Sequence, residues 1–227
     1  TLFIYFSNFY FLNELLIMRT GIAFSILFFA IRYLKYDKKK YILLVILGSF
    51  FHRISLVALL PILLFKIEFI RKRKLVLISL AVAFILGRGE IIPFIANNLI
   101  TFLPHKIIIY FENYEPKEAS YRQLILFLPI FLYFLKNFYK YKNVRFFEES
   151  ILFLFLMIIS KFIFIKHETL DRISHLFLMG ILFLPDIYLK SIKEKEVRFF
   201  TKFMIIVFFG LLLIWYLRGD NVITIVW

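Results

Sequence analysis

The chain contains no cysteine among its 227 residues. This absence excludes disulfide bonds and thiolate metal sites, and it leaves the redox compartment open. The glycine-rich loop that binds phosphates and the paired-histidine zinc motif are also missing. Residues 1–12 have neither an initiating methionine nor the basic flank of a signal peptide. They are typical of the end of a membrane span, and we expect further helices before them.

Hydrophobic residues make up 62% of the chain, and its mean hydropathy is +0.86. Soluble domains average roughly 45–50% apolar residues, and one core of this size cannot hide the excess. Lys, Arg, Asp and Glu are missing from several stretches that approach the roughly 20 residues needed to cross a bilayer. These stretches are 20–31, 75–87, 123–135, 173–185 and 203–217. The sequence therefore predicts an all-α fold, a polytopic transmembrane helix bundle. We expect one transmembrane domain over 1–227, the carboxy-terminal portion of a longer membrane protein.

The net charge of +14 is concentrated in four basic clusters that separate apolar stretches. A basic protein can bind nucleic acid, but clusters in this arrangement are better explained by the positive-inside rule of membrane proteins. We therefore predict no nucleic-acid partner, and we expect every cluster to face the cytoplasm. The clusters are 35–40, 66–74, 136–145 and 190–198.

Only the 25 residues 41–65 separate the first two basic clusters. A single span would put those clusters on opposite sides of the membrane, and two complete spans do not fit. We therefore predict a broken-helix, re-entrant hairpin at 41–65, with half-helices at 41–50 and 54–65. Non-helical backbone at membrane depth needs protein or a wet cavity to cover it. One long tilted helix with a frayed centre is the alternative.

The hairpin makes the charge distribution consistent along the whole chain. With it, 19 Lys and Arg residues fall on the inner side and 10 on the outer side. Including the acidic residues, the inner side carries about +12 and the outer side about +2, as the positive-inside rule requires. A single span at 41–65 would invert every later segment.

The predicted topology gathers five basic or titratable residues toward the outer face. Ionisable residues within spans usually face a bundle interior or a wet cavity, and they often mark functional sites. Arg19 and Arg172 each open an apolar helix, where a positive side chain is unfavourable unless an anion lies nearby. The five residues are Arg19, His52, Arg53, Arg88 and Arg172.

Structural roles compete with the functional interpretation at each of these positions. A single arginine at a membrane interface is often only a topology anchor. Lys161 lies about one turn from the outer end of its span, and we expect it to extend to the membrane surface. His175 lies one turn after Arg172. It is either a partner of the site or a polar group that faces the bundle, and the sequence does not separate these two roles. A histidine at a helix break, such as His52, is the hardest to explain as an inert residue.

Residues 18–65 carry a recurrent pattern of the EpsG family of exopolysaccharide polymerases, which are Wzy-like membrane proteins. The pattern is an arginine, a helix with small residues, a basic loop, and an apolar run that contains Phe-His and a serine. The chain resembles it with Thr20 in place of the usual glutamine and with Arg53 after the histidine. Residues 171–185, "DRISHLFLMGILFLP", resemble a later segment of the family. The matching positions are Arg19, Gly21, Ala23, 35–40, Phe51, His52, Ser55 and Arg172.

This resemblance implies a glycosyltransferase of the bacterial cytoplasmic (inner) membrane that polymerises polyprenyl-diphosphate-linked oligosaccharide units into exopolysaccharide or capsule. Arginines suit the diphosphate leaving group because they are always charged and bind phosphate bidentately. Arg19 and Arg172 are the first candidates, with Arg53 and Arg88 in reserve.

His52 is the candidate general base, and burial beside Arg53 favours its neutral, proton-accepting form. Glu168 and Asp171 are weaker candidates for the base. The outer face offers no cluster of carboxylates, so we predict metal-independent chemistry without a cofactor. The substrate and membrane lipid are the expected partners, and binding of a chain-length regulator or other polysaccharide-assembly proteins is left open.

Other functional classes compete with the polymerase. A transporter or flippase of lipid-linked sugars would also place arginines in a wet cavity beside a broken helix. It would be expected to show an internal repeat, and the sequence shows none. A membrane acyltransferase using His52 would need a second polar residue in the same helix, and a purely structural subunit would not need His52.

Overall fold

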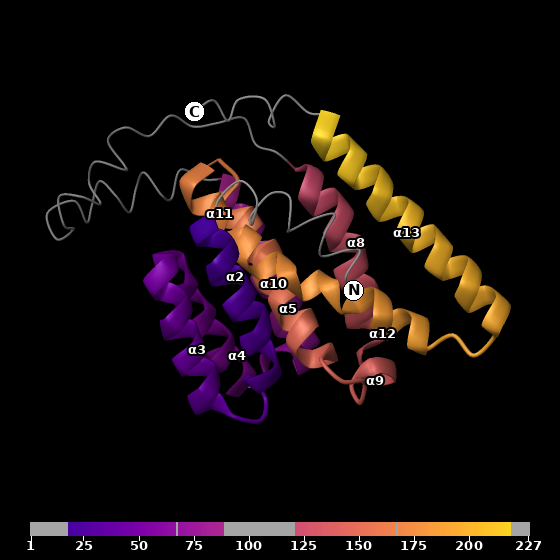
Figure 1. The fold of residues 1–227 in the computed structure, drawn as a ribbon, viewed down its shortest axis with the longest axis horizontal. Coiled ribbons are helices and arrows are strands. Elements are labelled where there is room, and N and C mark those ends of the chain that lie inside the picture. Colours follow the sequence, from indigo (N-terminus) through magenta and orange to yellow (C-terminus); the bar gives the residue numbers. More distant parts are fainter. Residues whose placement is uncertain (1–17, 67, 89–120, 167, 219–227) are drawn as a thin grey trace, which may run out of the picture.

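A computed structural model of the chain describes residues 18–66, 68–88, 121–166 and 168–218, and the predicted span 1–12 lies outside these ranges. The described residues form helices and turns and contain no strand, which confirms the all-α prediction (Figure 1). The helices are α2 Met18–Ala30, η2 Ile31–Tyr33, α3 Lys38–Phe51, η3 Arg53–Leu59, α4 Leu60–Lys66, η4 Phe69–Arg71, α5 Arg73–Arg88, α8 Arg122–Lys136, α9 Phe138–Tyr141, α10 Phe147–Phe164, α11 Glu168–Phe177, η5 Leu178–Leu182, α12 Leu184–Lys190 and α13 Lys195–Arg218.

The uncharged stretches identified in the sequence all lie in these helical segments. By length and composition, one stretch within the described ranges, Ile173–Lys190, is long and apolar enough to cross a membrane. It joins α11, η5 and α12. The apolar part of α8 is shorter, and α10 combines 18 residues with the charged side chains of Glu148, Glu149 and Lys161.

The chain breaks its helix at His52, within the stretch where the sequence predicts a break. His52 has extended backbone angles (φ −149°, ψ 111°) between the end of α3 and the start of η3. The returning segment begins as a 3-10 helix and becomes an α-helix at Leu60. Pro61 has no N–H to bond the carbonyl of Val57, four residues earlier, so a regular α-helix cannot run through this point from η3.

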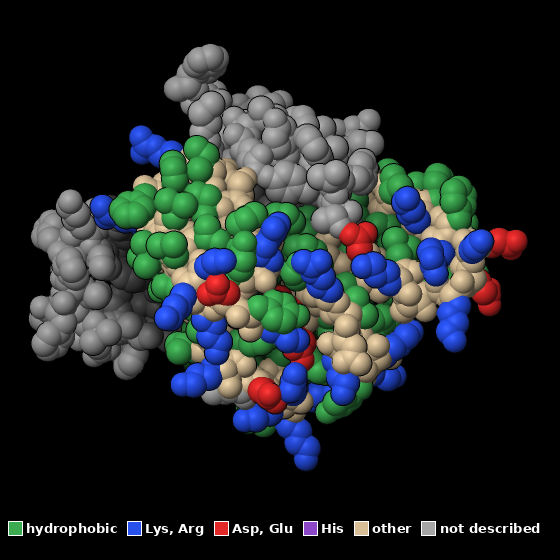
Figure 2. Space-filling view, turned by 60° about the horizontal axis from the view of Figure 1, so that its bottom comes forward, with side chains coloured by type: hydrophobic (Ala, Val, Ile, Leu, Met, Phe, Trp, Pro, Cys, Tyr) green, Lys and Arg blue, Asp and Glu red, His purple; other side chains and the backbone are tan. Residues whose placement is uncertain are grey.

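The four basic clusters meet at one end of the bundle. Glu148, in the first turn of α10, accepts hydrogen bonds from Lys35 (3.0 Å) and from Arg71 (2.8 and 3.1 Å), which joins the first two clusters. The guanidinium of Arg73 lies 5.1 Å from the ring centre of Tyr139, in the third cluster. Tyr141 is hydrogen bonded to Ser191 of the fourth cluster, at 3.3 Å. Figure 2 shows Lys and Arg side chains gathered over this face, which we call the basic end.

Helix α10 forms the centre of the fold. Of its 18 residues, 14 are buried, and α10 contacts α4, α5, α8, α11, η5 and α12 (Figure 1). A helix that is apolar on all sides is expected to be surrounded by others, and α10 is such a helix apart from its two ends. Close backbone approaches support this packing, because a Cβ at Gly180 would lie 2.6 Å from the carbonyl oxygen of Ser150.

We expect Glu148→Gln to destabilise the fold by about 2 kcal/mol, because Glu148 is almost buried and holds two cationic loops at once. Lys35 and Arg71 are partly exposed, so solvent screens part of the attraction. Burial raises the pKa of Glu148, which lies at the basic end before the apolar part of α10, but the hydrogen bonds from Arg71 and Lys35 outweigh burial and hold the pKa below its ordinary value. This contribution to stability is therefore present at neutral pH and is lost as pH falls through the lowered pKa.

Thermal unfolding of the purified chain in detergent measures the effect. Glu196→Gln is the matched control, because Glu196 also lies in the first turn of a helix, α13, but is exposed. An unfolding temperature of Glu148→Gln equal to that of wild type would show that this ion-pair group does not hold the basic end together.

Candidate functional site

The residues singled out in the sequence lie toward the end of the bundle opposite the basic end. Along each helix, a similar number of residues separates them from the nearest basic cluster: Arg19 precedes Lys35 by 16 residues, His52 follows Lys40 by 12, and Arg88 follows Arg73 by 15. At the rise of 1.5 Å per residue in an α-helix, these separations correspond to about 18–24 Å. The candidate residues therefore form a layer at a common height, which we call the polar layer.

His52 occupies the sharpest backbone feature of this layer. Its side chain is half-buried and makes a contact with the protein. Its N–H donates to the carbonyl of Gly48 (3.0 Å), and its carbonyl accepts from the N–H of Ser55 (2.9 Å), so the break is bonded on both sides. These bonds hold the backbone of His52 at the point where α3 ends and the returning segment begins.

Three of the elements that carry candidate residues meet at this break. η3, which begins beside His52, contacts α2, which carries Arg19, and α11, which carries Arg172. α2 also packs along α3 (Figure 1). Segments far apart in the sequence are thus brought to one end of the bundle. The side chain of Arg19 is exposed there.

Arg53 and Arg88 lie at the same height as His52 but differ in their surroundings. Arg53 is the first residue of η3, and its side chain is exposed. Arg88 ends α5, and its guanidinium lies 4.6 Å from the ring centre of Phe84 on its own helix. α5 packs on α10, so Arg88 is placed by α10 rather than by the break at His52.

Helix α11 carries the remaining candidates. The backbone of Glu168, Asp171 and Arg172 lies in α11, while their side chains are outside what the structure describes. His175 is in the last turn of the same helix, half-buried and with a protein contact, one turn after Arg172. The helix therefore presents Arg172 and His175 at neighbouring heights.

Lys161 corrects one expectation from the sequence. It was expected to extend to the membrane surface, but its side chain is only 4% exposed. The expectation was wrong because it considered one helix alone, whereas α10 is surrounded on several sides, and a Cβ at Gly87 of α5 would overlap the backbone carbonyl of Phe162, the residue after Lys161. Spacing along α10 gives no signal for this burial.

The buried polar residues of the described chain fall into two groups at opposite ends of the bundle. Glu148, Glu149 and Ser150 lie at the basic end of α10. The second group lies at the polar layer, on three elements in mutual contact through α11; its members are Ser55 of η3, Ser160 and Lys161 of α10, and Ser174 of α11.

Ser55 belongs to the quoted family pattern but received no role from the sequence. Its side chain is fully buried, and within the described part of the chain its hydroxyl has no hydrogen-bond partner. The hydroxyl faces α3, since a Cβ at Gly48 would lie 3.6 Å from it. An unpaired buried hydroxyl costs about 1–3 kcal/mol of folding free energy. Ser55 therefore places an unsatisfied polar group in the protein interior, three residues after His52.

A separate cavity of about 430 Å³ lies between α8, α12 and α13. Tyr133, Tyr188 and Phe208 are among its lining residues, which are largely apolar. It contains none of the candidate residues and lies nearer the basic end, because Tyr188 is two residues before Lys190. The cavity therefore does not bring any of the candidate residues together.

Comparison with known families agrees with the pattern around Arg19 and His52. The EpsG family model matches residues 1–224, almost the whole chain. The chain belongs to the EpsG family. This family is associated with polysaccharide polymerase activity at membranes. No curated protein and no solved structure matches the chain. The EpsG assignment covers α2, the break at His52 and α11 together, so one family match includes all three elements that meet in the polar layer.

Proposed function

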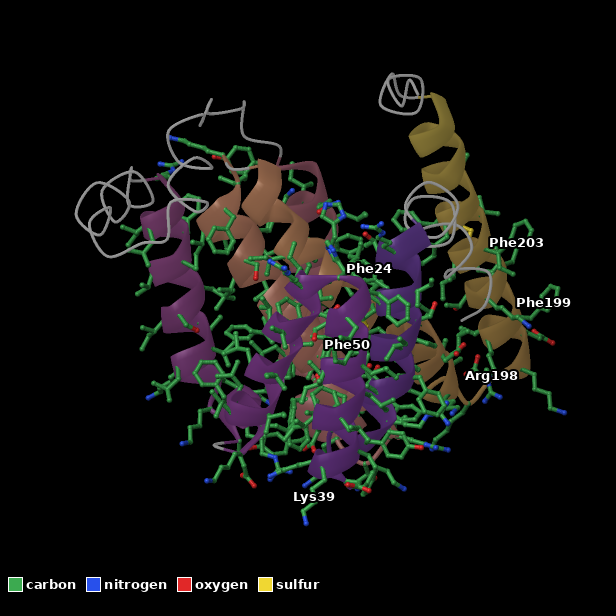
Figure 3. All side chains as sticks on the ribbon, turned by 60° about the vertical axis from the view of Figure 1, so that its left-hand side comes forward. Phe24, Lys39, Phe50, Arg198, Phe199 and Phe203 are labelled. Carbon is green, nitrogen blue, oxygen red and sulfur yellow. The ribbon has the colours of Figure 1, made fainter. Side chains whose placement is uncertain are left out.

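We propose that this EpsG-family chain is a multi-pass protein of the bacterial cytoplasmic membrane that polymerises lipid-linked oligosaccharide units on the outer side. The exposed apolar side chains support a lipid environment. Phe50 is 81% exposed and Phe199 is 75% exposed. Exposure of many such apolar side chains along a helix face is unfavourable in water. Figure 3 shows Phe199 and Phe203 pointing away from the bundle on α13.

The positions of the charges support the orientation. The basic end lies on the cytoplasmic side by the positive-inside rule. The hydrocarbon core is about 30 Å thick, so the polar layer, about 18–24 Å from the basic clusters, lies below the outer surface. A diphosphate held between outer headgroups can reach this depth, and the hairpin at 41–65 brings His52 to it.

The polar layer suits transfer of a glycan from a polyprenyl diphosphate. A hydroxyl oxygen of the acceptor unit attacks the anomeric carbon of the donor sugar, and the bond from that carbon to the diphosphate oxygen breaks. The electron pair leaves with the diphosphate, whose growing negative charge is neutralised by Arg19 and Arg172. Arg53 and Arg88 are further cations at the same height.

His52 accepts the proton that the acceptor hydroxyl loses. An imidazole nitrogen is suited to this step because the ordinary pKa of imidazole lies near physiological pH. The bonds that hold the backbone of His52 to Gly48 and Ser55 fix its Cα at the end of α3. A positioned base lowers the barrier more than a mobile one, because the orientation of the reacting groups is already set.

The observation that carries the proposal is the meeting of α2, η3 and α11 at the end of the bundle opposite the basic clusters, in a chain that belongs to the EpsG family. Arg19 lies in α2, Arg172 lies in α11, and His52 is the residue directly before η3. A purely structural bundle has no need to gather these residue types beside a broken helix.

Reconstitution of the full-length protein in vesicles with a polyprenyl-diphosphate-linked oligosaccharide is the direct test. We expect a ladder of products that differ by one repeat unit, and we expect His52→Gln to slow its formation about 100-fold, the usual contribution of a general base. Gel separation of labelled glycan measures both results.

Ser49→Ala is the matched control on the same half-helix, because the Ser49 hydroxyl donates to the carbonyl of Ile46 on its own helix (2.7 Å). It should leave the ladder unchanged. Movement of the labelled lipid across the bilayer without lengthening of the glycan would support a flippase instead and reject the polymerase.

A further inference from the structure

Lys161 is a buried cation that the mechanism above does not use. Its side chain is 4% exposed and lies near the outer end of α10, 13 residues after Glu148. That separation corresponds to about 20 Å, the height of Arg19 and His52. A lysine at such a depth is costly unless its charge is compensated, and such residues commonly mark functional sites.

The packing of α10 against α11 and η5 shows which way Lys161 faces. A Cβ at Gly180 would lie 2.9 Å from the backbone nitrogen of Leu154, so Leu154 is on the face of α10 that packs on this segment. Lys161 is seven residues further along, two turns of the helix, and therefore lies on the same face. Met157, between them on this face, is fully buried.

The register of the two antiparallel segments sets the level of Lys161 on α11. The rings of Phe153 and Phe177 are 5.7 Å apart, and Leu154 faces Gly180. Lys161 lies eight residues after Phe153 and seven after Leu154. Because the two segments are antiparallel, the residues at its level lie eight before Phe177 and seven before Gly180. These are residues 169–173, and they include Arg172.

Buried serines lie on the elements around Lys161. Ser160, next to it, and Ser174, on the facing helix, are both buried, and α11 in turn contacts η3 with the buried Ser55. Lys161 also makes a contact with the protein. An ammonium has three donors, so a protein partner and a phosphate oxygen can be held together.

We propose that Lys161 binds the diphosphate of the lipid-linked substrate from the protein interior, at the level of Arg172 along the contact between α10 and α11. This rests on the proposed function and adds to it a residue from the central helix. Arg19 and Arg172 approach the diphosphate from α2 and α11, and Lys161 closes the deep side. Lys161 thereby selects a diphosphate over a neutral lipid head.

Binding of farnesyl diphosphate to the full chain in detergent tests the inference. Lys161→Met keeps the length of the side chain and removes its charge, and we expect binding to weaken about tenfold or more, with an increased KM for the lipid-linked donor. Lys161→Arg, which restores the charge, should bind within about threefold of wild type. Binding of farnesol, which has no phosphate, should be the same in all variants. If Lys161 only supported the fold, Lys161→Met would change the binding of farnesyl diphosphate and of farnesol to the same extent.

Lys39→Met is the control, because Lys39 is exposed at the basic end and its loss should not change binding. If Lys161→Met does not accumulate, Lys161→Gln takes its place with the same expected results. Folded variants that bind farnesyl diphosphate as wild type does would overturn the role of Lys161 even if wild type polymerises. A wild-type chain that binds the probe through Lys161 and makes no polymer would instead overturn the polymerase and leave the diphosphate site.

Discussion

Arg19→Ala is expected to abolish long-chain polymer, lowering the rate of chain extension about 1,000-fold while single lipid-linked units persist. The leaving diphosphate gains negative charge as the glycosidic bond breaks, and a fixed cation in a site of low dielectric stabilises that charge most in the transition state. Removing one such group from an enzyme commonly costs a factor of about 100 to 1,000. The product ladder from reconstituted protein, or the length of polymer in a complemented strain, measures the loss.

Arg32→Ala is the matched control for this prediction. Arg32 follows α2 in η2, near the basic end, and is also exposed, with its guanidinium 4.1 Å from the ring centre of Phe29. The same charge is lost at the other end of the same segment, so chain length should stay normal. Arg172→Ala should behave like Arg19→Ala. Normal chain length in both variants at normal abundance would reject the proposed site.

The second large effect concerns the contact between α5 and α10. We expect Gly87→Ala to destabilise the protein by about 3 kcal/mol, because the new Cβ would overlap the carbonyl oxygen of Phe162 and lie 2.7 Å from its carbonyl carbon. Both obstructing atoms are backbone, so no side chain can rotate away. α5 must move off α10, which weakens the edge contact between the rings of Phe84 and Phe162 as well.

Gly48→Ala separates this steric effect from the effect of replacing glycine in a helix. The added Cβ at Gly48 would lie 3.6 Å from its nearest neighbours in α2 and η3, which is ordinary van der Waals contact. Alanine also favours a helix interior over glycine by about 1 kcal/mol. Thermal unfolding in detergent should therefore show Gly48→Ala at or above wild type and Gly87→Ala well below it. Equal unfolding temperatures for the two variants would contradict the close packing of α5 on α10.

The order of helices along the chain was predictable because apolar runs and basic clusters are local patterns. The break at His52 followed from a length argument, since 25 residues between two basic clusters allow neither one span nor two. The structure puts the break one residue after α3, although it makes the first part of the returning segment a 3-10 helix. The sequence did not specify that change, although Pro61 prevents a regular α-helix from running through from η3 into α4.

The site was predictable only in part. The arginines and His52 stood out because charge within apolar runs is costly, and that signal does not need a partner to be known. Lys161 gave the same signal and was interpreted wrongly. Whether a lysine near the end of a helix reaches solvent depends on which helices surround it. α11 follows α10 directly, but α5 comes from a distant part of the chain.

The sequence by itself determined that the chain is helical, where its helices change direction and which ends carry the positive charge, because each of these depends on residues close together along the chain. Only the tertiary structure decided that α2, η3 and α11 meet, that Glu148 joins two basic loops and that Lys161 is buried level with Arg172. Most of these contacts join residues far apart in the sequence. They depend on how helix surfaces fit against one another, which is a property of the whole bundle.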